Sequence, residues 1–162
     1  MHEKNIRIVS PGAWNKEFPD IGLHSIISQI DCYFALPISK QIELRTYSDK
    51  LEKNATIVTD IHNGEIVGFA AAYLNKEQES YISCLCVSPE YRGQGRAARI
   101  LNQLKTIAGQ LKIPSLTCRT NANDAIALRM YEKASFFPGE ENITVHGHEK
   151  VILTWHNPET SS

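Results

Sequence analysis

The sequence predicts an α/β (α+β) fold in which helices pack on a mixed β-sheet. Short runs rich in β-branched and aromatic residues alternate with longer runs whose apolar residues recur at helical spacing. Prolines and glycine-containing dipeptides separate these runs. The chain has 162 residues, of which 42% are hydrophobic and 22% charged, the size and composition of one globular domain. We therefore expect a single domain over residues 1–156, followed by a polar, frayed tail over residues 157–162.

The first half of the chain is expected to hold a strand, two helices and a hairpin. The expected elements are a strand at 7–10, helices at 23–34 and 38–51, and strands at 56–61 and 66–70. Pro11-Gly12 ends the first strand, and Pro37 ends the first helical pattern. Asn63-Gly64 stands between the last two strands and is a dipeptide favoured by tight hairpin turns.

The second half returns to alternating strands and helices. We expect strands at 81–87 and 115–120, a helix from about 96 to 111, a helix capped from within 121–124, and strands at 136–145 and 151–155 joined around Gly147. Pro89 closes the strand at 81–87. The resulting order, β-α-α-β-β-β-α-β-α-β-β, is that of a mixed sheet with helices packed against it.

Charge is unevenly distributed along the chain. The net charge is −1, which argues against a nucleic-acid-coating protein. Residues 92–133 nevertheless carry a charge of +6 and the remaining residues −7. The basic residues of the segment are Arg92, Arg96, Arg99, Lys105, Lys112, Arg119, Arg129 and Lys133. A local positive field of this kind suits a small polyanionic ligand, and a solvated basic helix face is the alternative.

Several features favour the cytoplasm. No apolar run approaches the roughly 18 residues that cross a bilayer, and the first residues do not resemble a secretory signal. Four dispersed cysteines do not form a disulfide framework. Cys84 and Cys86 share one face of a strand and Cys118 lies on a neighbouring one, but no fourth ligand accompanies them, so we expect buried, inert thiols and no metal.

A glycine-rich turn between a strand and a helix is the candidate binding site. Gly93 and Gly95 let the backbone approach a ligand closely. The first turn of the following helix presents unpaired N–H groups to an anion. No acidic residue lies about 20 positions downstream, as a Rossmann site requires, and the Gly-Lys-Ser/Thr of a Walker loop is absent from the sequence.

The residues around this turn resemble the signature of the GNAT N-acetyltransferase superfamily. In Arg92-Gly93-Gln94-Gly95-Arg96-Ala97, the residues Arg92, Gly95 and Ala97 occupy the defined positions of the motif Q/R-x-x-G-x-G/A. The segment 124–136 is similar to a second motif, N-x-x-A-x-x-x-Y-E-K-x-G-F. It departs from that motif at Asp124, beside which Asn123 stands, and at Ser135, where the family has glycine.

The resemblance implies a mainly antiparallel sheet of about seven strands with about four helices, splayed between strands 4 and 5, with acetyl-CoA in the gap. The implied coenzyme-binding residues are Leu85, Cys86 and Val87 on the fourth strand; Arg92, Gly93, Gln94, Gly95, Arg96, Ala97 and Ala98 at the phosphate turn; and Asn123 or Asp124. Tyr131 is the implied general acid, with core packing of its ring as the alternative. Glu79, Glu140, Glu141 and His146 are weak candidates for a base.

The expected activity is therefore transfer of an acetyl group from acetyl-CoA to a primary amine of a small molecule or protein. The alternatives are a non-catalytic acyl-CoA-binding or sensing module and a general phosphate-ligand interaction domain. The resemblance places acceptor selection in residues 23–53 and the last hairpin, with Cys32, Tyr33, Phe34 and Tyr47 as candidate pocket residues. We expect no nucleic-acid or membrane partner, and a homodimer remains open.

Overall fold

The computed structural model describes residues 5–75, 77 and 79–160. The α-helices are α1 (Trp14–Glu17), α2 (Leu23–Ile30), α3 (Leu44–Asn54), α4 (Arg96–Gln110) and α5 (Ala125–Lys133), with 3₁₀ turns η2 (Asp31–Tyr33), η3 (Ile38–Lys40) and η4 (Pro89–Tyr91). The strands are β1 (Ile6–Val9), β2 (Thr56–His62), β3 (Glu65–Tyr73), β4 (Tyr81–Val87), β5 (Ser115–Asn121), β6 (Phe137–Pro138), β7 (Ile143–Val145) and β8 (His148–His156).

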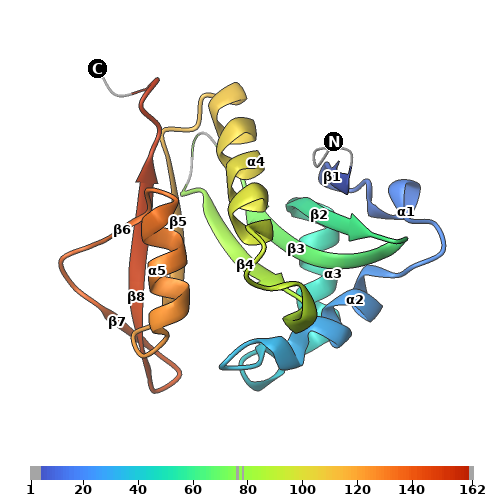
Figure 1. Cartoon of the computed structure of the whole chain (residues 1–162), viewed down its shortest axis with the longest axis horizontal. Coiled ribbons are helices and arrows are strands. Elements are labelled where there is room, and N and C mark those ends of the chain that lie inside the picture. Colours follow the sequence, from blue (N-terminus) through green and yellow to red (C-terminus); the bar gives the residue numbers. More distant parts are fainter. Residues whose placement is uncertain (1–4, 76, 78, 161–162) are drawn as a thin grey trace.

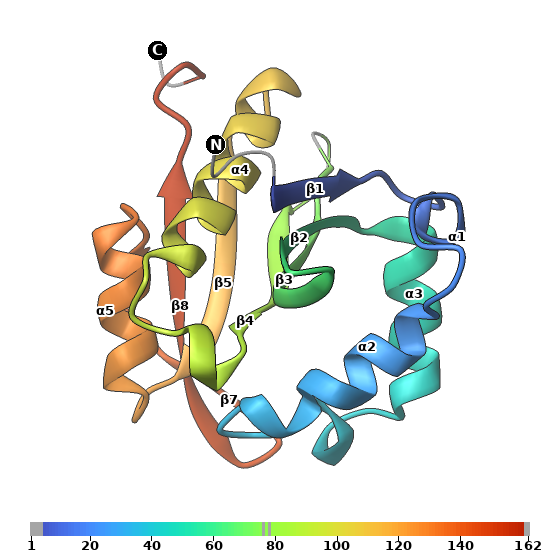
Figure 2. The ribbon, with the colours of Figure 1, turned by 45° about the vertical axis from the view of Figure 1, so that its right-hand side comes forward.

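All the strands form one mixed sheet that opens in its middle. Its order is β1-β2-β3-β4-β5-β8-β6, and β7 also pairs with β8. The pair β4–β5 is parallel, and within the described residues its register joins Tyr81 to Thr117 alone. Beyond that point the two strands diverge, as Figures 1 and 2 show. The predicted mixed, mainly antiparallel sheet with a gap between strands 4 and 5 is confirmed.

Each face of the sheet carries its own core. The helices α4 and α5 cover one face, where Ile100, Leu104 and Leu116 are fully buried. The helices α1 to α3 cover the other face, where Trp14 and Phe69 are fully buried. The helical spacing of apolar residues after Gly95 therefore identified a real buried stripe.

A β-bulge in β4 changes which face its side chains reach. Ile82 pairs with Ala72 and Cys84 with Ala71, so Ser83 is the extra residue. Ile82 consequently packs on the α4 side, whereas Cys84 and Cys86 pack on the α2 side. The two thiols do share a face, as predicted, and Cys118 on β5 lies on the opposite one.

The two tight hairpin turns lie at the glycines from which they were predicted. Asn63 and Gly64 both have positive φ (51° and 79°) between β2 and β3. His146 and Gly147 do the same (50° and 79°) between β7 and β8. Left-handed backbone at both central residues suits the twist of the flanking strands, which is why these turns are tight.

Some boundaries differ from the sequence prediction. The strand expected over 136–145 is two short strands, separated by residues 139–142. The one-turn helix α1 was missed, because one turn has too few residues to show a period. The helix expected over 23–34 ends at Ile30 and continues as the 3₁₀ turn η2.

The tail is not frayed where it begins, which corrects the expectation. Asn157 is 2% exposed. Its side chain donates to the Ile113 carbonyl at 2.9 Å, and its backbone N–H donates to the Pro114 carbonyl at 2.8 Å. The predictions for the N-terminus and for the end of the tail concern residues 1–4, 161 and 162, which lie outside the described residues. In the described part of the chain, no helix is long and apolar enough to cross a membrane.

Candidate functional site

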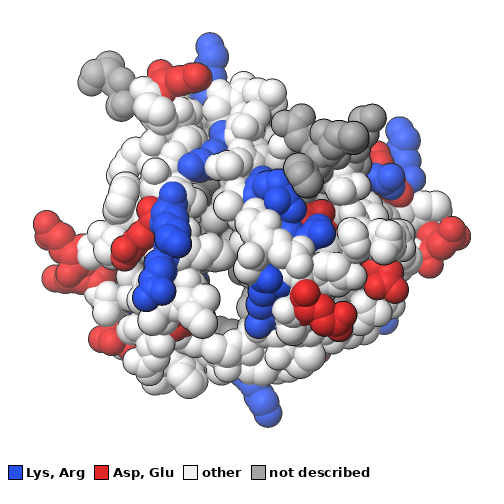
Figure 3. All heavy atoms as spheres, viewed as in Figure 1, with Lys and Arg blue, Asp and Glu red and all other residues white. Residues whose placement is uncertain are grey.

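The gap between β4 and β5 contains a cavity of about 470 Å³. Its walls are β4, β5 and the inner face of α5, and the segment 34–41 after α2 closes it from the other face of the sheet. Figure 3 shows the gap as a hollow in the surface, with basic side chains on both flanks. A parallel strand pair that separates after one register position leaves backbone N–H and C=O groups on both strands for a ligand.

The glycine-rich turn connects β4 through η4 to α4. Gly93 and Gly95 both have φ of 76°, a conformation that L-residues rarely adopt. Gly95 is the N-cap of α4, and no side chain caps the helix. The first-turn amides, from Arg96 to Ala98, are thus free of a side-chain acceptor and face an approaching anion with the positive end of the helix dipole.

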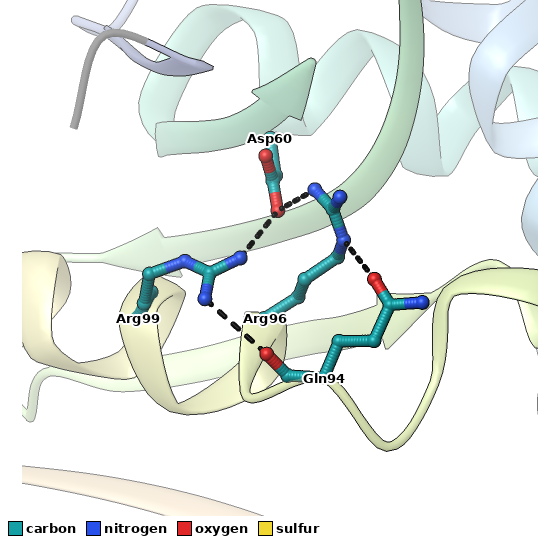
Figure 4. A network of polar contacts seen from close by, with 4 residues as sticks. All are labelled: Asp60, Gln94, Arg96 and Arg99. Atoms are coloured by element: carbon teal, nitrogen blue, oxygen red, sulfur yellow. Dashed lines mark hydrogen bonds and ion pairs between the residues drawn. The ribbon is translucent and has the colours of Figure 1, made fainter. Parts of the chain in front are cut away.

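Two of the three arginines at this turn are paired with a carboxylate that the sequence analysis missed. Asp60 on β2 is 1% exposed. Its Oδ2 atom lies 2.9 Å from Arg96 Nη1 and 3.9 Å from Arg99 Nη2 (Figure 4). An acid inside the apolar, β-branched run 56–61 was the signal that could have identified it.

The same network fixes the turn itself. Arg96 Nε donates to Gln94 Oε1 at 3.1 Å, and Arg99 Nη1 donates to the Gln94 carbonyl at 3.3 Å (Figure 4). Arg92 points the other way, its Nε donating to the Val87 carbonyl at 3.0 Å. The buried Asp60 therefore connects the turn to the sheet through two guanidinium groups.

The three candidate residues on β4 are arranged differently. Leu85 lines the cavity. The side chains of Cys86 and Val87 are buried, with Cys86 in the core on the α2 side. Burial raises the pKa of the Cys84 thiol to about 11 and that of Cys118 to about 12, and it raises the pKa of Cys86 as well. These thiols stay protonated near neutral pH, so none is an activated nucleophile.

The start of α5 separates the two candidates left open by the sequence. Asp124 is the N-cap, its Oδ1 accepting from the Ala127 N–H at 3.0 Å, and it lines the cavity. Asn123 is exposed and does not line it. Of the two residues, Asp124 is therefore the one that borders the cavity at the start of α5.

Tyr131 packs in the core and also borders the cavity. It is 6% exposed and packs edge-on against Phe136, with ring centroids 5.7 Å apart, as a core residue would. It also lines the cavity. Burial, with a further contribution from the Cys118 thiol, raises the pKa of Tyr131 well above its ordinary value. Its hydroxyl is consequently a neutral proton donor at physiological pH.

Of the weak base candidates, Glu79 alone lines the cavity. Thr117 Oγ1 donates to Glu79 Oε1 at 3.0 Å, which places the carboxylate where β4 and β5 meet. Phe34 lines the cavity too, while the Tyr47 hydroxyl lies 2.7 Å from Ser83 Oγ at the β-bulge. Among the described residues, no group of three His, Cys, Asp or Glu side chains is arranged to hold a metal ion.

Solved structures that are similar to this chain include several acetyltransferases. It is 20% identical to the ribosomal-protein-S18-alanine N-acetyltransferase of Escherichia coli, over 93% of each chain with a TM-score of 0.70. A GNAT family acetyltransferase from Elizabethkingia anophelis with acetyl-CoA bound matches 94% of this chain and 98% of its own, at 18% identity and a TM-score of 0.63.

A proposed streptothricin acetyltransferase from Bacillus anthracis, in complex with acetyl coenzyme A, aligns less completely. It is 23% identical over 64% of this chain, which spans 63% of that protein, with a TM-score of 0.58. A comparison with curated proteins gives no match. The family model for the acetyltransferase (GNAT) family matches residues 24–136, most of the chain. This protein therefore belongs to the GNAT family of acetyltransferases.

Proposed function

We propose that this protein transfers an acetyl group from acetyl-CoA to a primary amine of a small molecule or a protein. The observation that carries the proposal is the cavity between β4 and β5, which borders the buried, neutral Tyr131. The chain continues from β4 through the glycine-rich turn to the N-terminus of α4, which no side chain caps. The E. coli and B. anthracis neighbours are named for a protein amine and a small-molecule amine respectively, so both acceptor classes stay within the proposal.

The coenzyme would be held by the residues already described. In this proposal its pyrophosphate lies on the turn from Gly93 to Ala98, where glycine backbone and first-turn amides supply hydrogen bonds. Its pantetheine arm pairs with the open edge of β4 along residues 85–87. Within the described residues Arg92 forms no ion pair with Asp60, and its Nε donates to the Val87 carbonyl, so its two Nη groups are proposed to contact phosphate.

Transfer begins when the amine nitrogen attacks the thioester carbonyl carbon. A backbone N–H of β4 stabilises the oxyanion, and collapse of the tetrahedral intermediate breaks the carbon–sulfur bond. The Tyr131 O–H gives its proton to the departing thiolate. Before the attack, Glu79 takes a proton from the substrate ammonium, directly or through water, because this carboxylate borders the cavity. The nitrogen loses a second proton to solvent as the intermediate collapses, and solvent returns a proton to Tyr131.

Purified protein tests the proposal in two steps. Calorimetry measures acetyl-CoA binding, and thiol release reports turnover with a panel of amines and amine-bearing peptides. We expect saturable binding and amine-dependent release of one thiol per acetylated amine. Binding without turnover by any amine would instead favour an acyl-CoA-binding module. Absence of acetyl-CoA binding by the folded protein would reject the coenzyme assignment itself.

A further inference from the structure

One wall of the cavity is a polar patch formed by β5 and β8. In β5, the alternate residues Leu116 and Cys118 pack into the core beneath α4 and α5. Thr117, Arg119 and Asn121 therefore lie on the other face of the sheet. Lys150 on β8 is the register partner of Asn121 and shares that face with it. All four residues line the cavity, opposite the segment 34–41.

The patch carries two cations without matching anions. Within the described residues, neither Arg119 nor Lys150 forms an ion pair. Two acidic residues also line the cavity, where Glu79 accepts from Thr117 and Asp124 caps α5. Neither forms an ion pair with Arg119 or Lys150 within the described residues. Partial burial lowers the pKa of Lys150 below its ordinary value.

A buried acceptor lies in the same patch. Asn121 Oδ1 is shielded from solvent and has no hydrogen-bond partner among the described residues. Buried polar atoms are nearly always paired, and this oxygen, closed to solvent, would reach a ligand donor in the cavity only after its side chain turned. It lies in direct register with Lys150 and two residues along β5 from Arg119.

This charge pattern bears on the acceptor because an amine substrate is itself cationic before it reacts. A pocket for a simple amine or polyamine would be lined by carboxylates, whereas this wall is positive. The carboxylate of Glu79 accepts a hydrogen bond from Thr117. Arg119 lies two residues further along β5, which is a distance of about 7 Å along the strand. The cavity thus has the Glu79 carboxylate at the strand junction and two cations further along β5 and β8, where Asp124 also borders it.

We propose that the acceptor is a small amine that also carries an anionic group, such as an amino acid, whose anion is bound by Arg119 and Lys150. This inference rests on the proposed acetyltransferase function and assigns its substrate class. The coenzyme phosphates do not account for the patch, because Arg119 and Lys150 lie on the sheet face opposite α4 and its phosphate turn.

The test uses amines in matched pairs that differ in the anionic group alone. The pairs are amino acids with their carboxamides, and aminoalkyl phosphates with the corresponding amino alcohols; the two kinds of pair distinguish carboxylate from phosphate recognition. Thiol release from acetyl-CoA gives kcat/KM for each acceptor, and calorimetry on the CoA-saturated protein gives its affinity. We expect the anionic member of a pair to be preferred by about tenfold or more, as for a charge-assisted hydrogen bond.

The variants Arg119→Gln and Lys150→Gln connect that preference to the patch. Each variant should lower the preference for the anionic member of a pair by about tenfold, chiefly by raising the KM of that acceptor. The KM of acetyl-CoA should be unchanged. Arg119→Lys should retain part of the preference. Arg129→Gln is the matched control, because Arg129 is exposed on α5 and does not line the cavity. Thermal unfolding checks that every variant is folded.

The outcomes separate the inference from the proposed function. Equal or better use of the uncharged members, an unchanged preference in both variants, or failure of every anionic amine to bind the wild-type CoA complex would overturn the inference. The inference would also be overturned if the protein acetylated peptides and no small amine. The acetyltransferase proposal would still stand in each case, provided that acetyl-CoA binds and an amine is turned over. Loss of acetyl-CoA affinity in Arg119→Gln would instead assign the patch to the coenzyme.

Discussion

At the scale of single residues, burial shifts the pKa of an ionisable side chain and so determines whether that side chain is protonated. Tyr131 is buried in an apolar setting that penalises its phenolate, so its pKa is raised well above 10. The protonated form is the one that a general acid needs. It therefore persists at any pH below the ordinary pKa of tyrosine, and Tyr131 ionisation should produce no loss of activity as the pH approaches 10.

The Tyr131→Phe variant tests the proposed acid. It removes one oxygen and keeps the ring that packs against Phe136, so fold and coenzyme affinity should survive. We expect kcat to fall by roughly 10²–10⁴, as for loss of a general acid, which corresponds to about 3–5 kcal/mol in the barrier. Single-turnover kinetics should be used so that chemistry is observed. Normal single-turnover rates would leave Tyr131 as a core residue.

Asp60 is the residue whose charge connects the glycine-rich turn and the start of α4 to the sheet. Replacing it with Asn keeps the shape and removes the charge that balances Arg96, whose side chain is 10% exposed. Since breaking a buried ion pair leaves an uncompensated charge, we expect Asp60→Asn to lower the free energy of unfolding by about 3 kcal/mol. Urea denaturation measures it. Asp49→Asn, an exposed residue on α3, should change it by less than about 0.5 kcal/mol; equal effects would contradict the buried pair.

At the scale of elements, the turn before α4 depends on left-handed glycine and on an uncapped helix start. Gly95→Asp would add a side chain, backbone strain and a negative charge where the proposed pyrophosphate lies. We expect acetyl-CoA binding to become undetectable by calorimetry. Gly12→Asp is a matched control, because Gly12 has φ of 80° and open space around it, remote from the turn. Unchanged affinity in the folded Gly95→Asp protein would remove the turn from the coenzyme site.

The packing of α4 on β3 makes a separate prediction. A Cβ added at Gly68 would lie 2.8 Å from Ile100 Cδ1 and 3.1 Å from Asp60 Cβ. We expect Gly68→Ala to lower the free energy of unfolding by about 1–3 kcal/mol through overpacking. Ile100→Val removes the clashing Cδ1 atom, so adding it to Gly68→Ala should cost less than it does in the wild type. Additive effects in this double-mutant cycle would refute the close contact.

The elements also show how far the sequence leads. Asn63-Gly64, the turn at Gly93 and Gly95, and α5 were predictable because their signals are local. The pairing of Asp60 with Arg96, the bulge at Ser83 and the shared face of Asn121 and Lys150 were not. Each depends on the register between segments distant in sequence, and a shift of one residue would reverse which face every side chain occupies.

At the scale of the whole molecule, the sheet is two parts that join weakly at their shared edge. The strands β4 and β5 share the register pair Tyr81–Thr117, and α4 packs against β2, β3, β4 and β5, spanning the junction. A ligand that pairs with β4 and contacts α5 would connect the two parts further. Coenzyme binding is therefore expected to stabilise the molecule as a whole.

This stabilisation can be measured by thermal unfolding. A ligand that binds the native state alone contributes about 2.7 kcal/mol at a concentration one hundred times its Kd. For a chain of this length, that shift corresponds to a rise in Tm of about 5–10 °C. Hydrogen exchange should slow in β4 and β5 on the sides that face the gap, because their open backbone groups become paired. Gly95→Asp should show neither effect under the same conditions. An equal rise in Tm for that variant would mean that CoA stabilises the protein from a site other than the splayed strands, and the bridging role of the gap would be wrong.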